Sequence, residues 1–135
     1  MRLFDFLFTN KKAEKRFVSE QGFENNNKNQ ELTTLQIMDQ LRKVGVTPDK
    51  ELKLEYFFYT NTVDKAQILA AEIQQLNYSV QHNRSAGNSN LFVITGWTIK
   101  MKMTDSIVAE WAKKMCELGY KFDCDFDGWG TSLEQ

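Results

Sequence analysis

Four aromatic residues follow one another in this sequence, from Tyr56 to Tyr59. They lie within residues 53–60, a stretch of residue types that are favoured in β-strands. Because successive side chains of a strand point to opposite faces of the sheet, the run puts aromatic rings on both faces. A strand that is apolar on both faces is typical of the middle of a sheet. We therefore expect residues 53–60 to form a central strand.

Helical patterns lie on either side of this strand. Apolar residues recur at helical spacing in three segments, residues 31–44, 63–76 and 104–118. Thr62 and Thr104 stand at the start of the second and third segments, where a hydroxyl side chain can cap the free N–H groups of a helix. Gly119 follows the third segment and is a natural helix stop. These patterns predict three helices.

Alternating strand patterns occupy three further segments, residues 78–84, 91–103 and 120–127. From residue 52 onward the order is therefore strand, helix, strand, strand, helix, strand, which is the order of the ferredoxin-like split βαβ fold. We expect an α+β domain with a four-stranded antiparallel sheet, two helices on one face and an extra N-terminal helix. Right-handed crossovers would put the first and third strands in the centre.

The N-terminal part of the sequence differs in composition from the rest. We divide the chain into residues 1–30, a Phe-rich segment with a polar linker, and residues 31–135, the ferredoxin-like domain. Residues 25–30 are all polar and contain nothing to bury, which is typical of a linker. The apolar run before them suits a short helix that docks on the domain or on a partner. It is too short to cross a membrane and no signal-peptide cleavage site follows it, so we expect a cytoplasmic protein without membrane contact.

The charge balance and the motifs limit the classes of function that the sequence allows. The sequence has 17 Lys and Arg against 18 Asp and Glu, so it has no general attraction for nucleic-acid phosphates. Cys116 and Cys124 are too few for a disulfide framework or a structural zinc site. The one histidine, His82, stands in no recognisable catalytic motif, and no phosphate-binding loop or nucleophile motif occurs. We predict no cofactor and no enzymatic activity; an enzyme whose site gathers residues distant in sequence is the remaining alternative.

A resemblance to a known family appears near the C-terminus. Residues 126–129 read Phe-Asp-Gly-Trp and follow a helix that ends at Gly119. This run resembles the Tyr-Asp-Gly-Trp signature of the regulators of ribonuclease E activity B, which are ribonuclease E inhibitors. Residues 54–59 resemble the family's Val-Asp-His-Trp-aliphatic-Tyr strand, and the helix that ends at Gly45 resembles its opening helix. Over residues 31–130 the resemblance implies a non-catalytic regulator with a protein partner, a ribonuclease.

The last strand provides the first candidate site. Asp123, Asp125 and Asp127 lie on alternate residues, so they point to the same face about 6.6–6.8 Å apart. Such a stripe can bind a basic segment of a partner, or can be a solvated face that protects a sheet edge. Three carboxylates could also hold a divalent cation, but a metal site usually needs ligands that converge, and the strand spacing spreads them apart. Trp129 is either a cap on the core or an exposed anchor for the partner.

The aromatic strand provides the second candidate site. Phe57 and Tyr59 are expected on the exposed sheet face, with Phe92 and Ile94 beside them, because the other two rings of the run face the helices. Aromatic rings on central strands stack on bases in the RNA-recognition motif, so single-stranded RNA binding is the alternative function. Residues 90–95 lack the basic-Gly-aromatic pattern of that motif. Nearby carboxylates would also repel phosphate, so a protein partner is favoured over nucleic acid.

Overall fold

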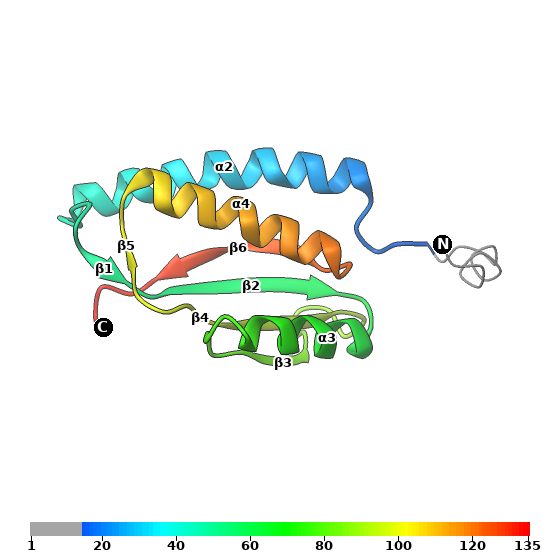
Figure 1. The fold of residues 1–135 in the computed structure, drawn as a ribbon. Coiled ribbons are helices and arrows are strands. Elements are labelled where there is room, and N and C mark those ends of the chain that lie inside the picture. Colours follow the sequence, from blue (N-terminus) through cyan, green and yellow to red (C-terminus); the bar gives the residue numbers. More distant parts are fainter. Residues whose placement is uncertain (1–14) are drawn as a thin grey trace.

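The structure, a computed structural model, describes residues 15–135. Its strands form a twisted sheet with helices packed against it (Figure 1). The docking predicted for the Phe-rich segment concerns residues that lie almost entirely outside the described part of the chain. In chain order the elements are α2 (Glu20–Lys43), β1 (Glu51–Leu52), β2 (Leu54–Thr60), α3 (Val63–Gln74), β3 (Gln81–Arg84), β4 (Phe92–Trp97), β5 (Met101–Lys102), α4 (Asp105–Lys121) and β6 (Asp125–Thr131).

The main sheet has four antiparallel strands in the order β3-β4-β2-β6. This order confirms an α+β fold with a four-stranded antiparallel sheet. The aromatic strand β2 is one of the two central strands, as predicted. The strand predicted over residues 91–103 is interrupted, because β4 ends at Trp97 and β5 pairs with β1 in a separate two-stranded sheet. The edges of the main sheet are therefore β3 and β6.

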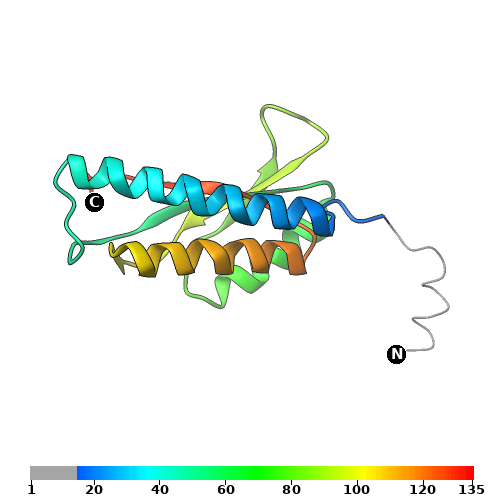
Figure 2. The same ribbon diagram turned by 90° about the horizontal axis from the view of Figure 1, so that it is seen from above.

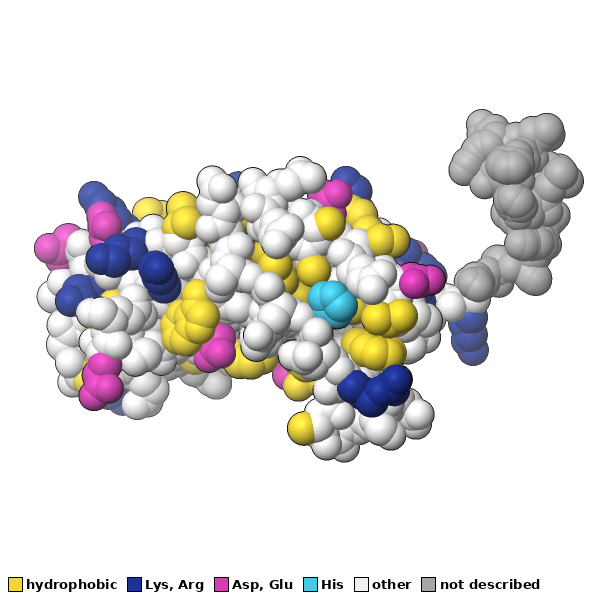
Figure 3. All heavy atoms as spheres, turned by 90° about the horizontal axis from the view of Figure 1, so that it is seen from below, with side chains coloured by type: hydrophobic (Ala, Val, Ile, Leu, Met, Phe, Trp, Pro, Cys, Tyr) yellow, Lys and Arg dark blue, Asp and Glu magenta, His cyan; other side chains and the backbone are white. Residues whose placement is uncertain are grey.

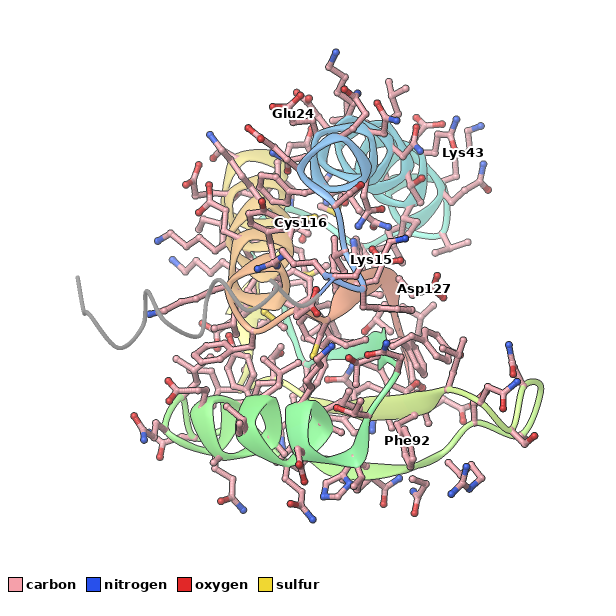
Figure 4. All side chains as sticks on the ribbon, turned by 90° about the vertical axis from the view of Figure 1, so that its right-hand side faces the viewer. Lys15, Glu24, Lys43, Phe92, Cys116 and Asp127 are labelled. Atoms are coloured by element: carbon pink, nitrogen blue, oxygen red, sulfur yellow. The ribbon has the colours of Figure 1, made fainter. Side chains whose placement is uncertain are left out.

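One face of the sheet carries the core. The rings of Tyr56 and Phe58 are fully buried there, and they contact the rings of Tyr78 and Phe126. Helices α3 and α4 cover this face, as the end-on view in Figure 4 shows. Both helices begin at the predicted threonine caps, whose hydroxyl oxygens accept hydrogen bonds from N–H groups of the first turn.

Helix α2 corrects the prediction of a linker over residues 25–30. The helix starts at the Ser19 cap and passes through this tract and through the predicted boundary at residue 30 without a break. Asn26 donates a hydrogen bond from Nδ2 to the main-chain oxygen of Phe126 at 2.7 Å. The polar residues are helical because α2 covers β6, an edge strand whose free main-chain groups need polar partners. Figure 2 shows α2 lying beside α4.

The end of α4 also differs from the prediction. The strand pattern assigned to residues 120–127 begins only at Asp125, and α4 runs on to Lys121. Gly119 is therefore inside the helix and does not end it. A Cβ atom there would lie 2.7 Å from the Cys124 main-chain oxygen and 2.9 Å from the Phe58 ring. Glycine at this position lets the helix lie close to the sheet, and Asp123, with a φ of 60°, turns the chain into β6.

The side chains of β4 point to the opposite faces of the sheet from those predicted. Ile94 is fully buried and lies opposite Phe58, on the helix-covered face, and Phe92 has the same parity. Trp97 was expected on that face but lies on the other. The physical reason is Gly96, which occupies the helix-covered side opposite Tyr56: a Cβ there would lie 1.9 Å from a main-chain oxygen and 2.6 Å from the Tyr56 hydroxyl.

This close approach gives a stability prediction. Gly96→Ala forces the sheet and the segment around Ser79 apart, and we expect it to lower the free energy of unfolding by about 2 kcal/mol or more. Urea denaturation followed by far-UV circular dichroism measures the change. The matched control is Gly130→Ala, also in a strand, where the added methyl meets no atom within 4 Å. Equal stabilities of the two variants would contradict the assigned packing.

Candidate functional site

The face of the sheet away from α3 and α4 is the first candidate surface. We call it the open sheet face. Strands β2 and β4 place their side chains there in register, and these side chains are neither buried nor fully exposed. Helices α3 and α4 lie on the other side of the sheet and α2 lies over its β6 edge (Figure 4). The paired residues are Glu55 with Trp97, Phe57 with Thr95, and Tyr59 with Val93.

The open sheet face therefore has an aromatic centre. Phe57 and Tyr59 lie on it as predicted, and Trp97 joins them in place of the expected Phe92 and Ile94. Sequence reasoning missed Trp97 because its ring was assigned to the core. The signal that could have identified it is the adjacent Gly96, which leaves room for the Tyr56 hydroxyl on the core side.

Strand β6 brings carboxylates to the edge of this face. Asp125 pairs with Tyr59, and the register then shifts so that Phe57 pairs with Gly128. The shift is a β-bulge, which accommodates one extra residue and re-aims its side chain. Asp127 is exposed at this bulge and lies on the side of β6 away from α4 (Figure 4). Within residues 15–135, the charged side chains that β2, β4 and β6 contribute to the open face and its β6 edge are all carboxylates.

The surroundings of Asp125 and Asp127 disfavour the charged form of each carboxylate. Burial raises the pKa of Asp125, and the neighbouring charge of Asp127 raises it further. Burial also raises the pKa of Asp127. Partly desolvated carboxylates of like charge oppose each other, so their presence costs stability at neutral pH. Groups with such perturbed pKa values cluster at functional sites.

Asp123 has a different role from the other two aspartates. It precedes β6, and its carboxylate accepts hydrogen bonds from the main-chain N–H groups of Phe17 at 2.9 Å and Val18 at 2.8 Å. Lys65 of α3 donates from Nζ to the same carboxylate at 2.7 Å, and an Arg16 nitrogen lies 3.5 Å away. Burial acts to raise the pKa of Asp123, but these hydrogen bonds and the Lys65 charge outweigh it, so the pKa lies below its usual value.

The contacts of Asp123 form what we call the N-terminal clamp, made by Asp123, Lys65 and Tyr120 around residues 16–18. The Arg16 guanidinium lies 4.3 Å from the centre of the Tyr120 ring and donates to the main-chain oxygen of that residue. Because Asp123 is occupied by the clamp and lies outside the strand, the prediction of a stripe of three equivalent carboxylates is wrong. Of the other two aspartates, Asp127 is exposed and Asp125 accepts a hydrogen bond from Asn26 Nδ2 at 3.3 Å.

Trp129 is buried, with 7% of its surface exposed. Its Nε1–H donates to the Thr34 hydroxyl at 3.0 Å, and its ring meets the Trp111 ring edge-on. The alternative of an exposed Trp129 anchor is therefore wrong, and the residue caps the core beneath α2. The Asp-Gly-Trp run has a structural explanation: a bulge at Asp127, a φ of 127° at Gly128, and a buried tryptophan after it.

A groove of about 600 Å³ lies between α2 and α4. Its lining mixes both signs of charge, and it contains neither histidine nor cysteine. The lower side of the molecule shows apolar side chains in small separate groups among polar ones (Figure 3). In the part of the chain that the structure covers, no cluster of three metal-ligating side chains occurs. None of the described helices is long and apolar enough to cross a membrane.

The fold and these surfaces define an α+β domain whose helices leave one face of the sheet open. The sequence matches the family model described as Regulator of ribonuclease activity B over residues 32–131, so the chain belongs to this family of ribonuclease regulators, as the resemblance predicted. No individual curated protein matches the chain. The matched range includes the whole four-stranded sheet and excludes residues 1–31, which contain the segment held by the N-terminal clamp.

The clamp gives the next prediction. Asp123→Asn keeps the side-chain size and tolerates the positive φ, but it removes the charge that pairs with Lys65. We expect the free energy of unfolding at pH 7 to fall by about 1–2 kcal/mol. A carboxyl group with a lowered pKa stabilises the fold above its unfolded pKa and loses this contribution as the pH falls through the folded value. The difference between the two proteins should therefore shrink below about pH 4.

Urea denaturation at several pH values measures this difference. The control is Asp39→Asn, which removes a carboxylate from a pair with Lys43 in which both side chains are 65% exposed. Such exposed pairs contribute little, so the control should match the parent protein. A difference for Asp123→Asn that stays constant down to pH 2 would show that its charge plays no part in the clamp.

Proposed function

We propose that this protein lowers the activity of a ribonuclease of the ribonuclease E type by docking on it through the open sheet face, in the cytoplasm and without catalysing a reaction. The observation that carries the proposal is the combination of three half-exposed aromatic rings with carboxylates on one face of the sheet. Membership of a family of ribonuclease regulators supports a ribonuclease as the partner.

The aromatic rings of Phe57, Tyr59 and Trp97 supply the binding energy in this proposal. Side chains of this kind are enriched among the few interface residues that dominate affinity, because they bury a large area at a low cost in conformational entropy. They stand on two adjacent central strands, so the surface is already rigid before the partner binds. Asp125 and Asp127 lie at the rim.

The rim carboxylates determine what kind of partner segment fits. A partner that brings Lys or Arg close to Asp125 and Asp127 neutralises charges that oppose each other in the free protein. An apolar segment flanked by basic residues meets both requirements of the open sheet face. We propose that the ribonuclease offers such a segment.

The fold itself supports a finer classification. We propose that the main sheet with α3 and α4 is ferredoxin-like, since the strand order β3-β4-β2-β6 and the two helices on one face have the arrangement of the split βαβ plan. In this view α2 is the extra N-terminal helix, and it covers the β6 edge. The open sheet face is then the face that this plan leaves without helices.

Single-stranded RNA binding is the alternative, and the half-exposed rings favour it because bases stack on such rings. The carboxylates at the rim oppose it, since they repel the phosphate chain. Titration of a labelled single-stranded RNA at low salt separates the two functions. Saturable RNA binding that is abolished by Phe57→Ala would replace the protein-docking proposal.

Truncation of a central ring tests the docking surface. We expect Phe57→Ala and Trp97→Ala each to raise the Kd for ribonuclease E of the same organism about 30-fold, or about 2 kcal/mol. Calorimetric titration of the purified proteins measures the affinity. The control is Ile68→Ala, which removes a side chain that is 52% exposed on α3 and should leave the Kd unchanged. An unchanged Kd for both folded ring variants would refute this choice of surface.

The rim carboxylates give a separate prediction. Asp125→Asn and Asp127→Asn should slow association about two- to fivefold and weaken its dependence on salt, while dissociation changes little. Since burial raises both pKa values, each ionised carboxylate destabilises the fold as the pH rises, so neither variant should lose stability at pH 7. Stopped-flow binding at two salt concentrations measures the rates. Association rates that match the parent protein at both salt concentrations would contradict the role of the rim.

A further inference from the structure

We propose that two copies of this chain associate through the outer face of α2, with the two helices antiparallel across a two-fold axis. The outer face is the exposed stripe of α2 that points away from the sheet. Its residues are Glu24, Lys28, Leu32, Leu35, Asp39 and Lys43. The inference goes beyond the proposed function and does not depend on it, because the contact uses no residue of the open sheet face.

Helix geometry puts these residues on one side of α2. Each is three or four residues from the next, and residues at these spacings are neighbours on a helix surface. Figure 4 looks along α2 and shows Glu24 and Lys43 on the side of the helix away from the sheet. The other side of the helix is buried, through Gln30, Thr34, Met38 and Leu41. The fold of one copy therefore leaves the outer face exposed.

Two leucines form the centre of the outer face. Leu32 is 61% exposed and Leu35 is 48% exposed, and they are the exposed large apolar side chains of α2. Apolar side chains that are scattered singly over a surface are normal, but these two are three residues apart and form one patch. A second copy that covers both leucines removes their apolar area from water.

The charges on either side of the leucines make the outer face complementary to itself. We consider two helices that pair antiparallel about the point midway between Leu32 and Leu35. The facing pairs are then Leu32 with Leu35, Lys28 with Asp39, and Glu24 with Lys43. Every charged residue meets the opposite charge of the other copy, and the two-fold axis forms each pair twice. Charge complementarity therefore identifies the occupant of this face as a second copy.

Other arrangements of the two helices are less favourable. A parallel pair brings each residue to its own counterpart, so that Lys28 meets Lys28 and Asp39 meets Asp39. A shift of the antiparallel pair by one helical turn puts a leucine opposite a charge. In the proposed register the outer face presents two rows at i, i+4 spacing, and such rows interlock in the commonest class of helix pair. The pattern thus selects one orientation and one register.

The size of the contact determines its strength. One helix against another is a small contact, whereas specific stable interfaces bury about 1,200–2,000 Å². We therefore expect a reversible dimer with a Kd of about 100 µM at low salt, which weakens as salt screens the charges. In one copy Asp39 and Lys43 already lie 3.3 Å apart, so the second copy extends an existing ion pair.

Charge reversal tests the pairing in the full-length protein. Lys28→Glu brings two carboxylates together across the axis, and Asp39→Lys brings two ammonium groups together. Each variant alone should raise the dimer Kd at least about tenfold. An equal mixture of the two variants should dimerise like the parent protein, because each reversed charge then meets the other. Sedimentation equilibrium at low salt measures the average mass. A parent protein that stays monomeric at about 1 mM, or a mixture that stays monomeric, would overturn the proposal.

The apolar centre has a matched control elsewhere on the surface. Leu35→Ser should raise the dimer Kd at least about tenfold, because the two-fold axis removes two leucine contacts. Ile68→Ser changes a side chain of α3 that is 52% exposed, and it should leave the dimer Kd unchanged. Equal effects of the two substitutions would refute the outer face as the contact. Urea denaturation checks that both variants remain folded.

Binding to ribonuclease E separates this inference from the proposed function. At protein concentrations far below the dimer Kd, Leu35→Ser should bind ribonuclease E as tightly as the parent protein, because the open sheet face is intact. A parent protein that stays monomeric while Leu35→Ser weakens ribonuclease binding would overturn the proposal, since the ribonuclease is then the occupant of the outer face. Dimerisation by a protein that binds no ribonuclease would support the proposed dimer and refute the docking function.

Discussion

Strand β2 is the constraint on which the rest of the structure depends. It pairs with β4 on one side and β6 on the other, and its two faces carry rings with different surroundings. Tyr56 and Phe58 are fully buried beneath the helices, whereas Phe57 and Tyr59 remain half-exposed. A strand that contributes rings to both faces makes the core and the open sheet face parts of one rigid element. Changes in the core packing of β2 therefore affect the geometry of the open sheet face directly.

The two edge strands of the sheet, β6 and β3, are protected in different ways. The β6 edge is covered by α2, whose side chains Asn26 and Thr34 meet a main-chain oxygen and a tryptophan N–H. The β3 edge is short and polar, which limits pairing with other strands. A helix that covers main-chain groups needs polar residues where a helix that covers side chains needs apolar ones. This requirement accounts for an asparagine-rich helix within a folded domain.

The sequence was most informative where one local rule determined the outcome. The threonine caps and the aromatic strand follow from residue type alone. The errors arose where a residue's role depends on a distant neighbour. Residues 25–30 look like a linker until β6 is seen beside them, and Gly119 looks like a helix stop until Phe58 is seen against it. The direction of the β4 side chains depends on Gly96 and the Tyr56 hydroxyl, which are 40 residues apart in sequence order.

Among the candidate site residues, Phe57 and Tyr59 lie on the sheet face that parity predicts, because parity is a local rule. The burial of Trp129 and the clamping of Asp123 depend on contacts with α2, α3 and the N-terminal residues, which no local rule predicts.

The position of β6 has a consequence for synthesis of the chain. This strand leaves the ribosome after every other described element, yet it pairs with β2, caps the core with Trp129 and supplies the main-chain partner of Asn26. Until it emerges, the nascent protein holds a sheet with one uncovered side and a helix with no surface for its polar stripe. Contacts between segments so distant in sequence form late and slowly. The final turn and strand therefore act as the closing step of folding, and the N-terminal clamp on residues 16–18 cannot form before that step.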